Sequence, residues 1–183
     1  MIEIELLLKK IVRILEKLKI SYCITGGFAV SVWGRARSTF DIDIVVKLRI
    51  EKMAELLKEL KLLSKAGYLD ETTASRAINQ GGEFNFIHPE SGLKIDFWVI
   101  KKNDKIGEEE LSRRTAKKID KQKVYFISPE DLILSKLRWY KEGASDRHLE
   151  DVESVLKLSK VDLKYLKQQA RKQENLDILS ELL

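Results

Sequence analysis

The sequence predicts an α/β (α+β) protein in which a core of short strands and helices is followed by a helical region. Strand-like apolar runs such as 40–46 and 93–99 alternate with amphipathic segments such as 2–19. After residue 128 every segment has the spacing of a helix. We therefore expect a catalytic core over residues 1–127 and a helical region over 128–183 that packs on it.

Composition narrows the class of protein. The 183 residues are 44% hydrophobic, enough for one domain with a sizeable core, and the net charge of +5 mildly favours an anionic partner. Cys23 stands alone, so neither an intrachain disulfide nor a cysteine zinc site is expected. No apolar run reaches the roughly 18–20 residues of a membrane span. The beginning of the sequence is acidic and helical rather than signal-like, so we expect no membrane association and a cytoplasmic location.

The first half of the chain has a clear order of predicted elements. The periodicity predicts these segments: helix 2–19, strand 22–24, helix 28–33 ending at Gly34, strand 40–46 and helix 50–63. Residues 64–82 are poorly periodic, so we expect a connecting loop with one short helix; a flap over the substrate is the alternative. Strands 84–87 and 93–99 follow, joined by a turn at 88–92.

The second half begins with the highly charged stretch 101–123. We interpret it as a solvated helix with loops, and a basic groove for RNA is the alternative, although no aromatic residue is interleaved to stack bases. Strand 124–127 comes next. Ser128 and Pro129 then predict a sharp helix start with Ser128 as N-cap, and this helix runs to Lys141 or Glu142. The remaining predicted helices are one that begins at 145–146 and includes Leu156, one over 162–170 and one over 174–182.

Gly26 and Gly27 open the helix that follows the first strand. Without Cβ atoms they allow the backbone to come close to a ligand. A helix N-terminus directs its free N–H groups at the same point and favours an anion, typically a phosphate. The pair therefore predicts a phosphate-binding turn.

Asp41 and Asp43 lie two residues apart in a strand, so both carboxylates share one face. At about 5 Å and an effective dielectric near 20, their repulsion is about 3 kcal/mol. A shared cation removes this penalty. Oxygen ligands that leave room for water and substrate phosphates suit Mg²⁺.

Two further charged residues occupy unusual places. Asp96 lies within the apolar strand 93–99, and buried acids are rare unless paired or bound to metal; an edge strand with Asp96 facing water is the alternative. Lys136 shares a helix face with Leu132 and Tyr140, so it either reaches the phosphates or snorkels to solvent.

An acidic face is predicted on the helix that begins at 145–146. Arg147 and Asp151 have the spacing of a surface ion pair. The face comprises Asp146, Glu150 and Asp151, and helix support is the role that we assign to it.

These motifs together resemble a known superfamily. Gly26-Gly27, thirteen further residues and then Asp41-Ile42-Asp43-Ile44 resemble the signature of the polymerase-β-like nucleotidyltransferases. The segment from Arg37 to Asp41 is similar to the small bacterial and archaeal members, the minimal nucleotidyltransferases and the abortive-infection toxins of toxin–antitoxin pairs. The resemblance covers roughly residues 20–157.

The resemblance implies a nucleotidyltransferase fold, with a short mixed sheet packed with helices. It implies that Asp41, Asp43 and Asp96 hold two Mg²⁺ ions and that Asp96 helps to deprotonate the attacking hydroxyl. The implied nucleotide-binding residues are Gly26, Gly27, Arg37, Thr39 and Lys136. One departure is that many members have serine at the position of Gly27. Thr25 is the candidate replacement for that hydroxyl.

The leading hypothesis is a Mg²⁺-dependent enzyme that transfers a nucleoside monophosphate from an NTP to a hydroxyl and releases pyrophosphate. The acceptor is open between RNA such as tRNA, a protein and a small molecule, and a toxin with an antitoxin partner is the favoured form. The second hypothesis is a catalytically inactive nucleotide- or partner-binding module. The third is an RNA-binding protein that uses residues 101–123.

Overall fold

The computed structural model of the chain describes residues 2–143 and 145–183. Within them, six strands form one mixed sheet in the order β3-β4-β2-β1-β6-β5. The strands are β1 (Ser21–Ile24), β2 (Asp41–Lys47), β3 (Gly82–His88), β4 (Leu93–Val99), β5 (Thr115–Ile119) and β6 (Gln122–Phe126). The α/β class and the mixed sheet are confirmed.

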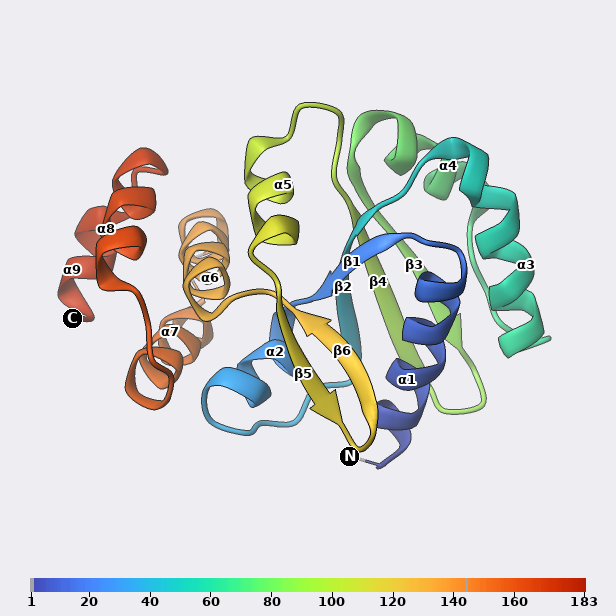
Figure 1. The fold of residues 1–183 in the computed structure, drawn as a ribbon, viewed down its shortest axis with the longest axis horizontal. Helices are drawn as coiled ribbons and strands as arrows, with labels where there is room; N and C mark the ends of the chain where they lie inside the picture. Colours follow the sequence, from blue (N-terminus) through green and yellow to red (C-terminus); the bar gives the residue numbers. More distant parts are fainter. Residues whose placement is uncertain (1, 144) are drawn as a thin grey trace.

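Nine α-helices and one 3₁₀ turn complete the described chain. They are α1 (Ile2–Lys17), α2 (Gly26–Trp33), the 3₁₀ turn η1 (Ile50–Lys52), α3 (Met53–Leu63), α4 (Glu71–Gln80), α5 (Lys105–Ser112), α6 (Pro129–Gly143), α7 (Asp146–Leu158), α8 (Leu163–Lys172) and α9 (Leu176–Glu181). Helices α1, α3 and α4 lie together on one side of the sheet, whereas α2, α5 and the group α6–α9 lie on the other (Figure 1). None of the described helices is long and apolar enough to cross a membrane.

The strand register brings the predicted carboxylates together. β2 and β4 are parallel, and Asp43 is the direct partner of Asp96. Ile42, Ile44 and Phe97 alternate with these acids and are fully buried on the opposite face. The alternation seen in the sequence thus divides β2 and β4 into a core face and a polar face.

Most predicted boundaries hold within two or three residues. α1 ends at Lys17 rather than at residue 19, because Lys19 adopts a left-handed φ of 55° that a helix cannot continue through. The short helix expected within 64–82 is α4. Ser128 caps α6 as predicted: its Oγ accepts the Asp131 N–H at 3.1 Å and donates to Asp131 Oδ2 at 2.7 Å.

The interpretation of residues 101–123 as a helix with loops missed a strand. Besides α5, this stretch contains β5, which pairs with β6 at the edge of the sheet. Its central residues, Ala116 to Lys118, are exposed and two of them are lysine, so the sequence lacks the apolar signal of a buried strand.

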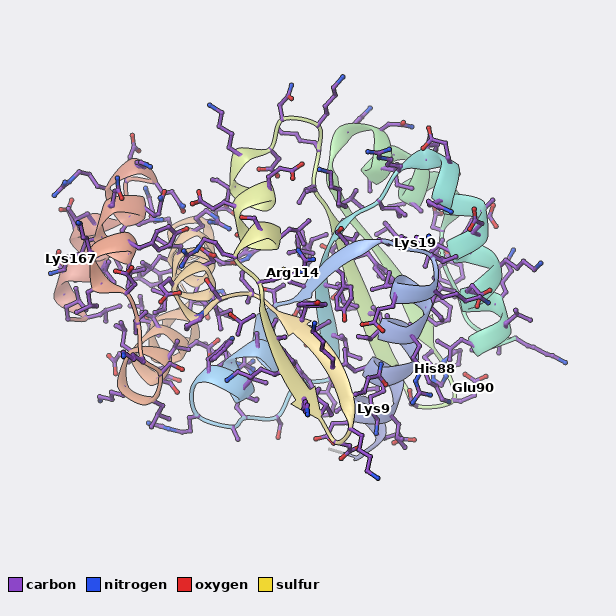
Figure 2. All side chains as sticks on the ribbon, in the orientation of Figure 1. Lys9, Lys19, His88, Glu90, Arg114 and Lys167 are labelled. Carbon is purple, nitrogen blue, oxygen red and sulfur yellow. The ribbon has the colours of Figure 1, made fainter. Side chains whose placement is uncertain are left out.

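Two arginines of the same stretch face inward, so they do not contribute to the basic groove that was the alternative interpretation. Arg113 pairs with Asp131 and Glu130, each at 3.2 Å. Arg114, labelled in Figure 2, donates to the Leu111 carbonyl and lies over the Tyr125 ring at 4.7 Å. The basic surface is therefore made by lysines alone and is smaller than the sequence suggested.

Candidate active site

A cavity of about 740 Å³ opens on the polar face of β2 and β4. Its walls come from the start of α2, the 37–40 loop, β2, β4, α5, α6 and α7. Seven of the eight predicted site residues line it: Gly26, Gly27, Arg37, Thr39, Asp41, Asp43 and Lys136. Asp96 is not among the described residues that line this cavity.

Gly26 packs directly against the carboxylate of Asp43. Its φ of +61° is left-handed, and a Cβ at this position would lie 1.8 Å from Asp43 Oδ2. The backbone N–H of Thr25 also donates to the Asp43 carbonyl at 2.9 Å. Only glycine can therefore bring the N-terminus of α2 this close to the carboxylate strand.

The serine expected from the resemblance has no room at Gly27. A Cβ there would lie 2.8 Å from Thr39 Oγ1 and 3.0 Å from Arg37 Nη2. The Arg37 and Thr39 side chains thus fill the space of a serine hydroxyl. Thr25, the predicted replacement, lines the cavity, and its side chain does not cap α2.

The two carboxylates of β2 have different partners. Thr39 Oγ1 donates to Asp41 Oδ1 at 2.5 Å, and the Trp98 indole N–H approaches Asp43 Oδ1 at 3.4 Å. Burial raises the pKa of Asp43, and the charges of Asp41 and Asp96 add to the rise. The free protein therefore holds Asp43 in an environment that disfavours its charge, a penalty that a bound cation would reduce.

Asp96 is buried, as predicted, rather than exposed at an edge. Lys94 Nζ lies 2.7 Å from Asp96 Oδ2, while Oδ1 is buried without a hydrogen-bond partner among the described residues. Glu83 on β3 shares this face, and burial together with the charge of Asp96 raises its pKa. Glu83 is a fourth acid that the sequence interpretation did not include.

The donor chemistry suits a hard cation. Within residues 2–143 and 145–183 no three or more His, Cys, Asp or Glu side chains form a ready-made metal cluster. Mg²⁺ is commonly held by one or two carboxylates together with substrate phosphates, without an all-protein cage. Asp41 and Asp43 on the cavity wall match that pattern, and the unpartnered Asp96 Oδ1 adds an oxygen beside them.

Two basic side chains, Arg37 and Lys136, form a basic wall on the α6–α7 side of the cavity, and both pair with Asp151. Arg37 donates to both Asp151 oxygens, from Nε at 2.9 Å and from Nη2 at 3.1 Å. Lys136 Nζ lies 2.9 Å from Asp151 Oδ2. The predicted surface pair of Arg147 with Asp151 is wrong, because Asp151 is 4% exposed and faces these two cations.

Lys136 belongs to the same wall. Its side chain is 8% exposed, so it does not snorkel. It reaches the cavity from the buried side of α6, where Asp151 offsets part of its charge.

The residues of the cavity that the sequence interpretation did not predict include two tryptophans and a histidine. Trp98 and Trp139 make an edge-to-face pair with centroids 5.3 Å apart, and both border the cavity. His148 borders it from the first turn of α7. Trp98 shares its strand face with Asp96, a signal that was present in the sequence. Trp139 and His148 carry no such signal, since each has the pattern of an ordinary helix residue.

Comparison with solved structures shows which known proteins have a similar fold. The antibiotic-resistance factor ANT(2'')-Ia in solution is 18% identical, with a TM-score of 0.62 over 93% of this chain and 92% of that one. ANT(2'')-Ia in complex with adenylyl-2''-tobramycin is 19% identical, with a TM-score of 0.61 over 93% of this chain and 98% of that one. The lincosamide antibiotic adenylyltransferase LnuA bound to lincomycin is 18% identical, with a TM-score of 0.56 over 86% of this chain and 98% of that one. At these identities the likeness shows a shared fold.

Sequence comparison identifies the family. No curated protein sequence matches the chain. One family profile, by contrast, spans almost its whole length, and its description agrees with the fold and with the resemblance stated above. The chain belongs to the family described as nucleotidyltransferases of unknown function (DUF6036), whose profile matches residues 1–182.

Proposed function

We propose that this nucleotidyltransferase moves a nucleoside monophosphate from an NTP to the hydroxyl of a small acceptor, with Mg²⁺, in the cavity between β2 and α6. The observation that carries the proposal is the contact of Gly26 with Asp43. It joins a helix N-terminus, which favours phosphate, to a carboxylate strand, which favours a cation.

The triphosphate is assigned to the side of the cavity where α2 begins. Gly26 and Gly27 provide the turn at the helix N-terminus, Arg37 lies beside Gly27, and Lys136 adds positive charge from α6. Thr39 fixes Asp41 by its hydrogen bond of 2.5 Å. Preorganised donors of this kind stabilise the charge that develops on a transferring phosphoryl group.

Asp41 and Asp43 would hold Mg²⁺, with Asp96 as the proposed third carboxylate. When bound, the metal neutralises phosphate charge and orients the reacting oxygens. Trp98 positions the Asp43 carboxylate through its indole N–H.

The proposed reaction forms one bond to the α-phosphorus of the NTP and breaks one. The acceptor oxygen forms a bond to the α-phosphorus, and the bond from that phosphorus to the bridging oxygen of the β-phosphate breaks. Pyrophosphate leaves with the bonding electron pair. The acceptor proton passes to a carboxylate of the site, for which Asp96 is our candidate because its Oδ1 has no other partner among the described residues.

A small acceptor is favoured over RNA or protein by the shape of the site. A cavity of about 740 Å³ lies within the roughly 300–1,000 Å³ range of small-molecule sites. Trp98 and Trp139 add an aromatic pair to the lining of the cavity. Two of the structural neighbours are described with small hydroxyl-bearing compounds, tobramycin as its adenylyl derivative and lincomycin. The toxin role, the antitoxin partner and the cytoplasmic location stay predictions.

Calorimetric titration tests the nucleotide site. ATP, GTP, CTP and UTP are titrated with and without Mg²⁺ into the wild type and into the Asp41→Asn/Asp43→Asn double variant. We expect Mg²⁺-dependent binding of at least one nucleotide to the wild type, with a loss of roughly 100-fold or more in the variant. Binding that survives in the folded variant would remove Asp41 and Asp43 from the site.

A second assay separates the enzyme from an inactive binding module. Pyrophosphate release is followed with a panel of small hydroxylated compounds, and with tRNA and protein as competing acceptor classes. Release that depends on a small acceptor supports the proposal. Release only with tRNA or protein would assign the other acceptor class, and nucleotide binding without release from any class would favour the binding module.

A further inference from the structure

We propose that His148 is a phosphate ligand of this cavity whose imidazole takes up a proton when the polyphosphate binds. The inference rests on the proposed function, because it deepens the role of the same cavity. It assigns a role to a residue that none of the sequence motifs singled out.

The position of His148 is the first argument. It borders the cavity from the first turn of α7, one turn before Asp151. Asp151 holds Arg37 and Lys136, the two cations assigned to the phosphates. His148 therefore belongs to the wall where we place the polyphosphate.

The hydrogen bonding of His148 is incomplete in the free protein. Its Nδ1 is buried and has no partner among the described residues. A protonated imidazole carries an N–H on both nitrogens, so protonation would add a donor to a ring that already lacks a partner. A ring fixed for a purely structural role would be expected to use this atom.

Burial and the charges around the ring disfavour its protonated form. Burial lowers the pKa of His148, and the nearby positive charges of Lys136 on α6, Arg37 on the 37–40 loop and Arg147 on α7 lower it further. Asp151 acts in the opposite direction and does not cancel them.

A bound polyphosphate would place negative charge beside His148, where positive side chains now dominate. Several negative oxygens would lie against the cations that now disfavour a positive imidazole, so the protonated ring gains an attractive charge. Because Nδ1 is enclosed, Nε2 is the nitrogen that would donate its N–H to a phosphate oxygen. Binding of phosphate and uptake of a proton are then thermodynamically linked, and each strengthens the other.

NMR of the two histidines tests the linkage. His148 and His88 are the only histidines in the chain, and His88, labelled in Figure 2, lies at the β3–β4 turn beside Ser91. Their imidazole resonances are titrated against pH, with and without saturating inorganic pyrophosphate and Mg²⁺. His88→Gln assigns the signals. The backbone amides of Gly26 and Gly27 show whether pyrophosphate occupies this cavity.

We expect pyrophosphate to raise the pKa of His148 by about one pH unit or more and to leave that of His88 unchanged. His148→Gln should weaken pyrophosphate binding roughly tenfold at pH 6 and little at pH 8.5, because only a protonated imidazole supplies a charge-assisted hydrogen bond. His88→Gln, measured at both pH values, corrects for the titration of pyrophosphate itself.

Two results would overturn the inference. Pyrophosphate that shifts the Gly26 and Gly27 amides but leaves the pKa of His148 unchanged removes the linkage and leaves the proposed function intact. Pyrophosphate that shifts neither the amides nor His148, with or without Mg²⁺, removes the phosphate site on which both proposals rest.

Discussion

At the scale of single residues, the site requires that Gly26 carry no side chain. The glycine combines a left-handed φ of +61° with a hypothetical Cβ only 1.8 Å from Asp43 Oδ2. The first feature is a backbone requirement and the second is a packing requirement. Gly92 offers a matched comparison, since its φ is +66° and nothing lies within 4 Å of the place that a methyl group would occupy.

Gly26→Ala should therefore lose nucleotide transfer or Mg²⁺-dependent nucleotide binding by roughly 100-fold or more, because the new methyl group displaces Asp43. Gly92→Ala should retain both properties and lose only about 1 kcal/mol of unfolding free energy, the cost of a left-handed alanine. Denaturant unfolding and calorimetry of the two variants provide the measurement. Equal function in both would show that the contact with Asp43 is unimportant.

The raised pKa of Asp43 leads to a second prediction at this scale. Between the ordinary pKa of an aspartate and the higher folded value, the folded state binds more protons than the unfolded state. The stability of the metal-free protein therefore falls as pH rises through this window and stays lower above it. Asp43→Asn, which keeps an acceptor for Trp98, should be more stable than the wild type at pH 7 without metal.

Unfolding free energies of the wild type and Asp43→Asn, measured from pH 3 to pH 8 in a chelator, check this prediction. The gap between the two proteins should close below the ordinary aspartate pKa, where both are uncharged at this position. Mg²⁺ with nucleotide should then stabilise only the wild type. A variant that is less stable than the wild type at pH 7 would contradict the assignment of burial as the dominant effect.

At the scale of elements, the start of α6 fixes where Lys136 lies. Ser128 and Asp131 form a reciprocal cap, and Asp131 also accepts from Tyr165 at 2.8 Å on α8. The cap thus connects the first turn of α6 to the last helices of the chain. The start of α7 differs, because the Ser145 side chain makes no capping hydrogen bond.

Ser128→Ala should lower the unfolding free energy by about 0.5–2 kcal/mol, and the midpoint of thermal unfolding by a few degrees, because the Asp131 N–H loses its acceptor. Ser145→Ala should change stability by less than about 0.5 kcal/mol. Thermal and denaturant unfolding of both variants distinguish the two caps. A similar loss in both would mean that the hydrogen bonds of the Ser128 cap do not govern stability.

At the scale of the whole molecule, the site is assembled across the predicted division of the chain. The division into a core of 1–127 and a helical region of 128–183 stays a prediction. The cavity takes Gly26, Asp41 and Asp43 from the first part, and Lys136 and His148 from the second. Asp151 joins the parts, since its carboxylate binds Arg37 from one and Lys136 from the other.

Asp151→Asn should lower the unfolding free energy by about 2–4 kcal/mol, because two cations lose their shared partner. The expected loss is smaller than for a fully buried ion pair, since the Arg37 side chain is 24% exposed. Pyrophosphate should restore part of the loss by supplying negative charge to the same cations. Asp146→Asn, at the exposed start of the same helix, is the control and should change little. Stability that is equal in the two variants would rule out Asp151 as the link.

The parts of the site that the sequence determined by itself are those set by local periodicity. Alternation along a strand placed Asp41 and Asp43 on one face, a glycine pair after a strand predicted the phosphate turn, and Ser128-Pro129 predicted the start of α6. These patterns act within a few residues, where backbone geometry alone decides which way a side chain points. The lysine-rich strand β5 lacked such a pattern and was missed.

Only the tertiary structure decided which distant groups meet. Arg37 and Asp151 are 114 positions apart, and Trp98 and Asp43 are 55 apart, so no local spacing connects them. The same reason explains why Asp151 was assigned to a surface pair with Arg147 and why Trp139 and His148 were not recognised as site residues. The sequence determined which side chains could do phosphate and metal chemistry, whereas packing of α6 and α7 against α2 decided which of them share a cavity.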